Sequence, residues 1–147
     1  MLDITVRGLQ LPDLRNGYLE TVAGLRPVEL TESEAEQIMR PLLRHKDWPT
    51  NYLVAEACGR VVGTVTVIIE QKLIHRGGRV AHIEDVATHP NFRQQGVGKR
   101  LLEYAIKLAG EKGCYKVILN CHPRLVPYYE QFGFFINERE MRLDLTN

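Results

Sequence analysis

The sequence predicts an α+β fold in which helices flank a mixed, mainly antiparallel central sheet. Two runs rich in β-branched residues, Asn51 to Ala57 and Arg60 to Glu70, are separated only by Cys58 and Gly59, which is the tight spacing of an antiparallel hairpin. Apolar residues then recur at helical spacing after Gly98. The predicted elements follow one another in the order β-α-α-β-β-β-α-β-α-β. With 147 residues, we expect one domain over residues 1–147.

One strand and two helices are predicted before the hairpin. Pro12 and Asp13 suit the first turn of a helix, and Thr31 is a capping residue followed by an acidic turn. Pro41 is expected to kink or shorten the second helix. The three elements are a strand at Leu2 to Arg7, a helix from Pro12 to about Gly24, and a helix from Thr31 to the Arg44–His45 region.

The second half of the chain is predicted to alternate strands and helices. Val80 to Thr88 is rich in β-branched residues and reads as a strand that Pro90 ends. The helix after Gly98 is expected to run to about Lys112. The remaining predictions are a strand at Tyr115 to Cys121, a short helix at Pro123 to Phe132, and a last strand at Phe134 to Leu145.

The loop between the Val80 strand and the following helix is a candidate anion site. Gly96 and Gly98 let the backbone curl, and free N–H groups point outward where the helix begins. Arg93, Lys99 and Arg100 add positive charge, so a phosphate or pyrophosphate is the natural ligand. The alternative is an ordinary strand–helix connection with two permissive glycines.

The composition limits the classes of function. A formal net charge of +1 argues against a large nucleic-acid footprint. The apolar runs are too short to span a membrane. Three cysteines without paired spacing fit a reducing compartment, and residues 1–10 do not resemble a signal peptide. We therefore expect a cytoplasmic protein that contacts neither nucleic acid nor membrane. No histidine spacing indicates a metal site.

The segment Arg93-Gln94-Gln95-Gly96-Val97-Gly98 resembles the pyrophosphate loop of the GCN5-related N-acetyltransferases (GNAT). Tyr128 to Phe134 looks like a second segment of that superfamily, and its fold is the one predicted above. A narrower resemblance is to the eukaryotic glucosamine-6-phosphate N-acetyltransferases. It is carried by Ala81-His82-Ile83-Glu84-Asp85-Val86, Gly113-Cys114-Tyr115-Lys116-Val117, Ile69 to His75 and Gly17 to Thr21, and so covers nearly the full chain.

This resemblance implies transfer of an acetyl group from acetyl-CoA to glucosamine 6-phosphate in a ternary complex, a step toward UDP-N-acetylglucosamine, with no metal. Tyr129 would protonate the leaving sulfur; the alternative is a packed aromatic ring, and Tyr129→Phe should lower turnover by roughly tenfold or more. The Val86 N–H would face the thioester oxygen. The implied acetyl-CoA residues are Val86, Ala87, Thr88, Arg93, Gln94, Gln95, Gly96, Val97, Gly98, Lys99 and Tyr129.

The acceptor site is expected near Glu84 and Asp85. These side chains should alternate across the strand and so cannot both enter one pocket. The basic segment Gln71 to Arg79 is either a solvated loop or a lip over an anionic substrate. The resemblance implies a homodimer with shared active sites. The implied substrate residues are Arg26, Lys72, His75, Glu84, Asp85, Lys116, Val117 and Asn120, with Arg79 as a further phosphate contact.

Two residues depart from the narrower family. Asn120 stands where an acid is usual, and an amide cannot take a proton from the amine. His122 follows on the same face and is a hypothesis for a substitute base, with a plain surface histidine as the alternative. Arg26 replaces a threonine near the phosphate. The catalytic candidates are thus Tyr129, Glu84, Asp85, Asn120 and His122. Other readings are acetylation of another small amine or of a protein or peptide amine, and a CoA-binding module without turnover.

Overall fold

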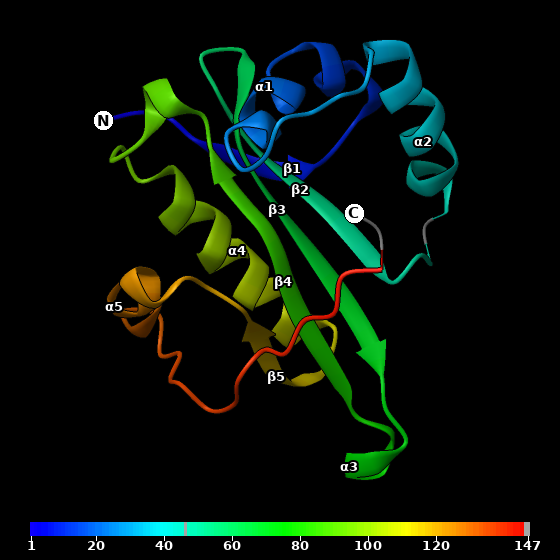
Figure 1. Cartoon of the computed structure of the whole chain (residues 1–147), viewed down its shortest axis with the longest axis vertical. Coiled ribbons are helices and arrows are strands. Elements are labelled where there is room, and N and C mark those ends of the chain that lie inside the picture. Colours follow the sequence, from blue (N-terminus) through cyan, green and yellow to red (C-terminus); the bar gives the residue numbers. More distant parts are fainter. Residues whose placement is uncertain (46, 146–147) are drawn as a thin grey trace.

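The computed structural model describes residues 1–45 and 47–145 and has a five-stranded sheet at its centre. The strands lie in chain order across the sheet (Figure 1). Neighbouring strands are antiparallel except for β4 and β5, which are parallel. The mixed, mainly antiparallel α+β prediction is therefore confirmed. The strands are β1 (Thr5–Gly8), β2 (Thr50–Ala57), β3 (Arg60–Gln71), β4 (Arg79–Thr88) and β5 (Cys114–Leu119).

Helices cover the sheet from both faces. The long helix α4 lies across one face, and α1 and α2 lie beside the β1–β3 part of the other face (Figure 1). In the described residues no helix is long and apolar enough to cross a membrane. The helical segments are η1 (Leu11–Arg15), α1 (Tyr18–Ala23), α2 (Glu32–Arg44), α3 (Ile74–Gly77), η2 (Pro90–Phe92), α4 (Val97–Glu111), η3 (Pro123–Leu125) and α5 (Val126–Glu130).

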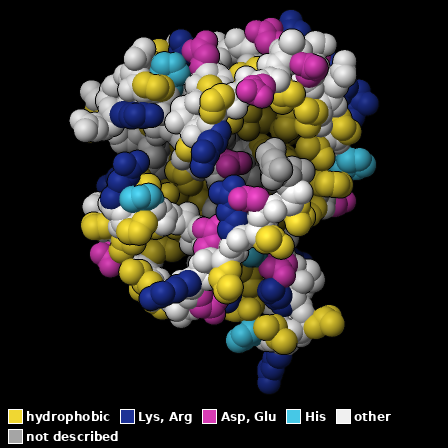
Figure 2. All heavy atoms as spheres, viewed as in Figure 1, with side chains coloured by type: hydrophobic (Ala, Val, Ile, Leu, Met, Phe, Trp, Pro, Cys, Tyr) yellow, Lys and Arg dark blue, Asp and Glu magenta, His cyan; other side chains and the backbone are white. Residues whose placement is uncertain are grey.

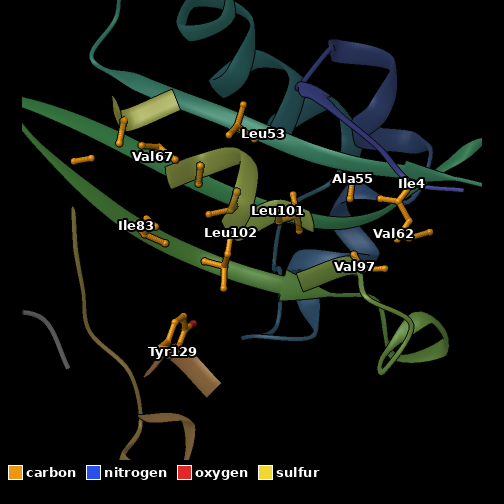
Figure 3. Packing of buried hydrophobic residues seen from close by; sticks show 14 of the residues in the cluster. Ile4, Leu53, Ala55, Val62, Val67, Ile83, Val97, Leu101, Leu102 and Tyr129 are labelled. Atoms are coloured by element: carbon orange, nitrogen blue, oxygen red, sulfur yellow. The ribbon is translucent and has the colours of Figure 1, made fainter. Parts of the chain in front are cut away.

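The main core lies between α4 and the sheet. Leu101 and Leu102 of α4 are fully buried against residues such as Val67 and Ile83 (Figure 3). Tyr129, from α5, lies at the border of this cluster. On the opposite face, β5 presents exposed side chains. These are Lys116 and Ile118, together with Asn120, which directly follows the strand. The sheet therefore leaves an accessible surface beside its only parallel pair in the described part of the chain.

A buried ion pair joins η1 to the first two strands. Arg7 donates to both carboxylate oxygens of Asp13, at 2.7 and 2.8 Å, and to Glu56 at 2.7 Å. The Gln10 N–H also donates to Asp13, which is only 4 % exposed. Burial alone would raise the pKa of Asp13, but the hydrogen bonds from Arg7 and Gln10 hold that pKa below its usual value.

Asp13→Asn is expected to lower the free energy of unfolding by about 2 kcal/mol near neutral pH, because it removes the more buried of the two carboxylates that pair with Arg7. The folded-state pKa of Asp13 is depressed, so the stabilisation is complete above its ordinary value of 3.8 and is lost as the pH falls through the lower folded value. Urea unfolding of both proteins at pH 7 and pH 3 measures this. A difference that does not shrink at the lower pH would contradict the assignment.

Several predicted elements need correction. The predicted last strand at 134–145 is wrong: these residues form no strand, because no neighbouring strand pairs with them. The predicted helix at 12–24 is two pieces, η1 and α1, since Gly17 has a left-handed backbone with φ of 98° between them. The predicted helix at 123–132 is likewise η3 followed by the short α5. The basic segment 71–79 holds the turn α3 instead of an open loop. Other boundaries shift by one to three residues.

Candidate functional site

A β-bulge in β4 separates the two acidic side chains. Thr64 pairs with Ala87 and Thr66 pairs with Glu84, so Val65 alone lies opposite both Asp85 and Val86. Asp85 takes a left-handed backbone with φ of 49°. A bulge leaves backbone groups unpaired and re-aims side chains. The strict alternation expected along this strand therefore fails at Asp85, and both acids are exposed.

Glu84 and Asp85 nevertheless have different neighbours. Glu84 lines a small pocket of about 40 Å³ together with Asn120, which follows β5, and with His82. The negative charge of Asp85 contributes, after burial, to raising the pKa of the phenol of Tyr18 in α1. The structure thus brings together Glu84 and Asn120 from the predicted set, and adds His82 beside them.

The predicted anion loop has the expected form. Gln94 and Gly96 both have left-handed backbone, with φ of 62° and 85°, and Gly96 caps α4. The first backbone bond of the helix runs from the Arg100 N–H to the Gly96 carbonyl. Among the residues described, no carbonyl accepts from the N–H groups of residues 94–99. These donors, at the positive end of a 15-residue helix, are suited to an anion.

The two tyrosines of α5 lie next to this helix. A Cβ built on Gly98 would come within 2.8 Å of the Tyr128 hydroxyl, so glycine is needed for this close approach. Tyr129 is 8 % exposed and packs edge-on against Tyr128 and Phe134. Burial, with smaller contributions from Cys121 and Tyr128, raises the pKa of Tyr129 to about 12. The phenol therefore keeps its proton at every working pH.

The Tyr129 hydroxyl is available to a ligand. In the described part of the chain this hydroxyl has no hydrogen-bond partner. It is not completely buried, so solvent or a ligand can contact it. Tyr129 is thus a packed aromatic residue that keeps a free donor. The packing is what the alternative reading described, and the role toward the leaving sulfur stays a prediction.

Basic and histidine side chains gather around the end of the β3–β4 hairpin (Figure 2). The His75 ring packs against Tyr115 of β5 with ring centroids 4.2 Å apart, and Lys116 Nζ lies 5.8 Å from the centroid of the same tyrosine ring. Lys72 pairs with Glu70. Arg79 is bonded to Gln71 and to the Lys112 carbonyl. His75 and Lys116 are therefore brought together, while Arg79 is already engaged.

Three predicted residues lie outside this group. Arg26 is exposed in the connection that follows α1. The Val117 side chain packs with the core, so only its backbone is open to a ligand from the exposed face. His122 caps η3, and its Nδ1 accepts from the Arg124 N–H at 3.2 Å. His122 does not line the pocket that Glu84 and Asn120 share.

Sequence reasoning did not single out Glu70 or Tyr18. Glu70 accepts from His82 at 2.8 Å across the β3–β4 pair, which only the strand register reveals. Tyr18 is subject to the charge of Asp85 because α1 packs on β3 and β4.

Comparison with known proteins gives consistent matches. Residues 12–134 match the family model described as "Acetyltransferase (GNAT) family". The chain is 35% identical over 150 residues to the glucosamine 6-phosphate N-acetyltransferase of Trypanosoma brucei brucei, covering 99% of this chain and 98% of the relative. It is 36% identical over 140 residues to glucosamine 6-phosphate N-acetyltransferase 1 of Oryza sativa subsp. japonica, covering 94% and 85%. The crystal structure of the Arabidopsis thaliana enzyme of that name superposes with a TM-score of 0.90 at 28% identity, covering 98% and 99%.

Proposed function

The chain belongs to the acetyltransferase (GNAT) family, and we propose that it transfers the acetyl group of acetyl-CoA to the amine of D-glucosamine 6-phosphate. The product is N-acetyl-D-glucosamine 6-phosphate, which feeds the synthesis of UDP-N-acetylglucosamine. The observation that carries the proposal is the near full-length similarity to enzymes of that name, combined with a free anion loop beside Tyr129. We place the reaction in the cytoplasm, in one domain spanning the chain.

The loop and β4 would hold acetyl-CoA. The N–H groups of residues 94–99 suit the pyrophosphate, and Arg93 and Lys99 add charge. The bulge after Glu84 supports a role for the Val86 N–H as a donor to the thioester oxygen, and Ala87 and Thr88 continue the strand beside it. Alignment of this kind contributes several kcal/mol to acyl transfer, on the order of 7–11 kcal/mol in the best intramolecular cases.

The acceptor would lie along the exposed face of β4 and β5. Glu84 and Asn120, with Asp85 on the other side of the bulge, can hold the amine and the sugar hydroxyls. His75 and Lys116, with Lys72 nearby, supply positive charge for the 6-phosphate, and the Val117 backbone lies between Lys116 and Asn120. Arg26 is a further phosphate candidate. His122 stays a candidate base.

A homodimer with shared active sites is supported by unpartnered apolar surface. In residues 134–145 the side chains of Phe135, Ile136, Met141 and Leu143 are 78%, 74%, 95% and 83% exposed. At the hairpin end, which bears the basic residues, Leu73 is 96% exposed. The free edge of β5 offers backbone groups to a strand from a second copy.

Thiol release from acetyl-CoA tests the proposal. Glucosamine 6-phosphate should be used at least about a hundredfold more efficiently, in kcat/KM, than glucosamine or spermidine, because the phosphate contacts are charge-assisted. Light scattering on the same sample tests for the dimer. Preference for spermidine or a peptide amine would favour the other acceptors. Tight CoA binding without thiol release would favour a binding module.

A further inference from the structure

Glu70 and His82 form a carboxylate–imidazole pair that the proposed mechanism has not used. Glu70 pairs with Val80 and Ile68 pairs with His82, so the two side chains are diagonal neighbours on one face of the β3–β4 pair. His82 Nε2 lies 2.8 Å from a Glu70 oxygen. Hydrogen bonds from Lys72 and then His82 hold the pKa of Glu70 below its usual value. Glu70 is therefore a carboxylate when it contacts the ring.

This contact fixes the chemical state of the histidine. A carboxylate only accepts, so Nε2 carries the proton in the neutral ring and Nδ1 has the free lone pair. A carboxylate behind an imidazole also stabilises the imidazolium once a proton arrives, as in hydrolase triads. Glu70 thus prepares His82 to act as a proton acceptor through Nδ1.

His82 shares its pocket with two polar groups next to the bulge. The pocket of about 40 Å³ is lined by His82, Glu84 and Asn120, with two apolar residues of β5 completing the wall. A cavity that holds a water needs roughly 10–15 Å³ and two to four polar partners. The pocket meets both conditions, so a water there can connect His82 with a group bound beside Glu84.

Acetyl transfer requires such an acceptor. Asn120 cannot take a proton. A carboxyl group ordinarily titrates near pH 4, far below neutrality, whereas imidazole ordinarily titrates between about pH 5 and 8, where base catalysis is most efficient. Resting on the proposed function, we propose that His82, positioned by Glu70, takes up the proton that the acceptor amine releases, through water in the pocket that it shares with Glu84 and Asn120.

The amine nitrogen bonds to the thioester carbonyl carbon, the C–S bond breaks, and the N–H proton passes through water to Nδ1. Tyr129 donates its proton to the departing sulfur. Exchange with solvent then removes the proton from His82 and restores the one on Tyr129, so that one proton has moved from nitrogen to sulfur overall.

Charged groups from three strands surround His82. Glu70 and Lys72 come from β3 and the residues after it, Glu84 from β4, and Lys116 from the same face of β5. Each contributes to the pH dependence. Each variant in the test must therefore change only one of these groups.

The experiment is the pH profile of kcat at saturating acetyl-CoA and glucosamine 6-phosphate for the wild type, His82→Gln, Glu70→Gln and His45→Gln. His45→Gln is the matched control, since His45 is exposed at the end of α2. The substrate's own ionisations are common to all four proteins. His82→Gln should lose about tenfold or more in kcat at neutral pH, and the fall in kcat toward acid pH that we expect of the wild type should disappear. Glu70→Gln should change kcat on the acid side of the pH profile by a smaller factor.

The proposal is overturned if His82→Gln keeps the wild-type rate, or if its rate falls equally at every pH, which would show a structural role only. The proposal is also overturned if the fall in kcat toward acid pH disappears in His122→Ala but persists in His82→Gln. Should His82→Gln fail to fold by circular dichroism, Glu70→Gln decides, because that side chain is 42% exposed. A wild type that releases no thiol with glucosamine 6-phosphate would refute the proposed function instead.

Discussion

Tyr129→Phe is expected to lower kcat about a hundredfold while the KM for acetyl-CoA changes by less than about threefold, because general-acid groups typically contribute a factor of that size. The ring remains to fill the core, and only the donor is removed. Burial raises the pKa of Tyr129 to about 12, so the phenol is protonated throughout the working range. The kcat of the wild type should therefore show no pH dependence from Tyr129 between pH 6 and 9. Steady-state thiol release measures the change.

The control is Tyr104→Phe, which makes the same chemical change on the exposed side of α4 and should retain full activity. Thermal unfolding of both variants shows whether packing has been disturbed. Parental turnover in Tyr129→Phe would remove the residue from the mechanism and leave it as part of the core alone.

The second large effect is expected on stability. A Cβ on Gly17 would lie 2.3 Å from the Val61 carbonyl oxygen, which is a backbone atom and cannot swing aside. Gly17 also has a left-handed φ of 98°, and it begins α1, whose Tyr18 is subject to the charge of Asp85. Gly17→Ala should therefore cost about 3 kcal/mol or more, combining backbone strain with overpacking.

Gly110→Ala is the matched comparison. Gly110 lies in α4 and a Cβ there would meet no atom within 4 Å, so alanine should stabilise the protein by up to about 1 kcal/mol through helix propensity. Urea unfolding of both variants gives the two free energies. Equal midpoints for Gly17→Ala and the wild type would mean that α1 can move away from β3 without loss.

Local patterns in the sequence were enough for the parts of the fold that depend on neighbouring residues. The β2–β3 hairpin follows from the two-residue turn at Cys58 and Gly59, and the loop before α4 follows from its glycines and the helical spacing after them. These features need no distant partner. Their bounds were predicted to within about three residues for the same reason.

Features that depend on a distant partner were missed or misjudged. Residues 134–145 have strand-like composition, but a strand exists only where another strand pairs with it, and here none does. The Glu70–His82 contact depends on the β3–β4 register, and the left-handed backbone of Asp85 depends on a bulge opposite Val65. The roles of the individual site residues remain predictions that the experiments above address.

The order of the strands bears on how the molecule folds. Only the β2–β3 and β3–β4 pairs join strands that are close in the chain, so only their contacts are inexpensive in chain entropy. The β1–β2 pair spans η1, α1 and α2, and the β4–β5 pair forms only after α4 has crossed the sheet. Because the anion loop, the pocket and the basic hairpin end all border the β4–β5 pair, we expect the nascent polypeptide to become competent for its ligands only after the local β2–β3–β4 contacts, when the longer-range pairs are made.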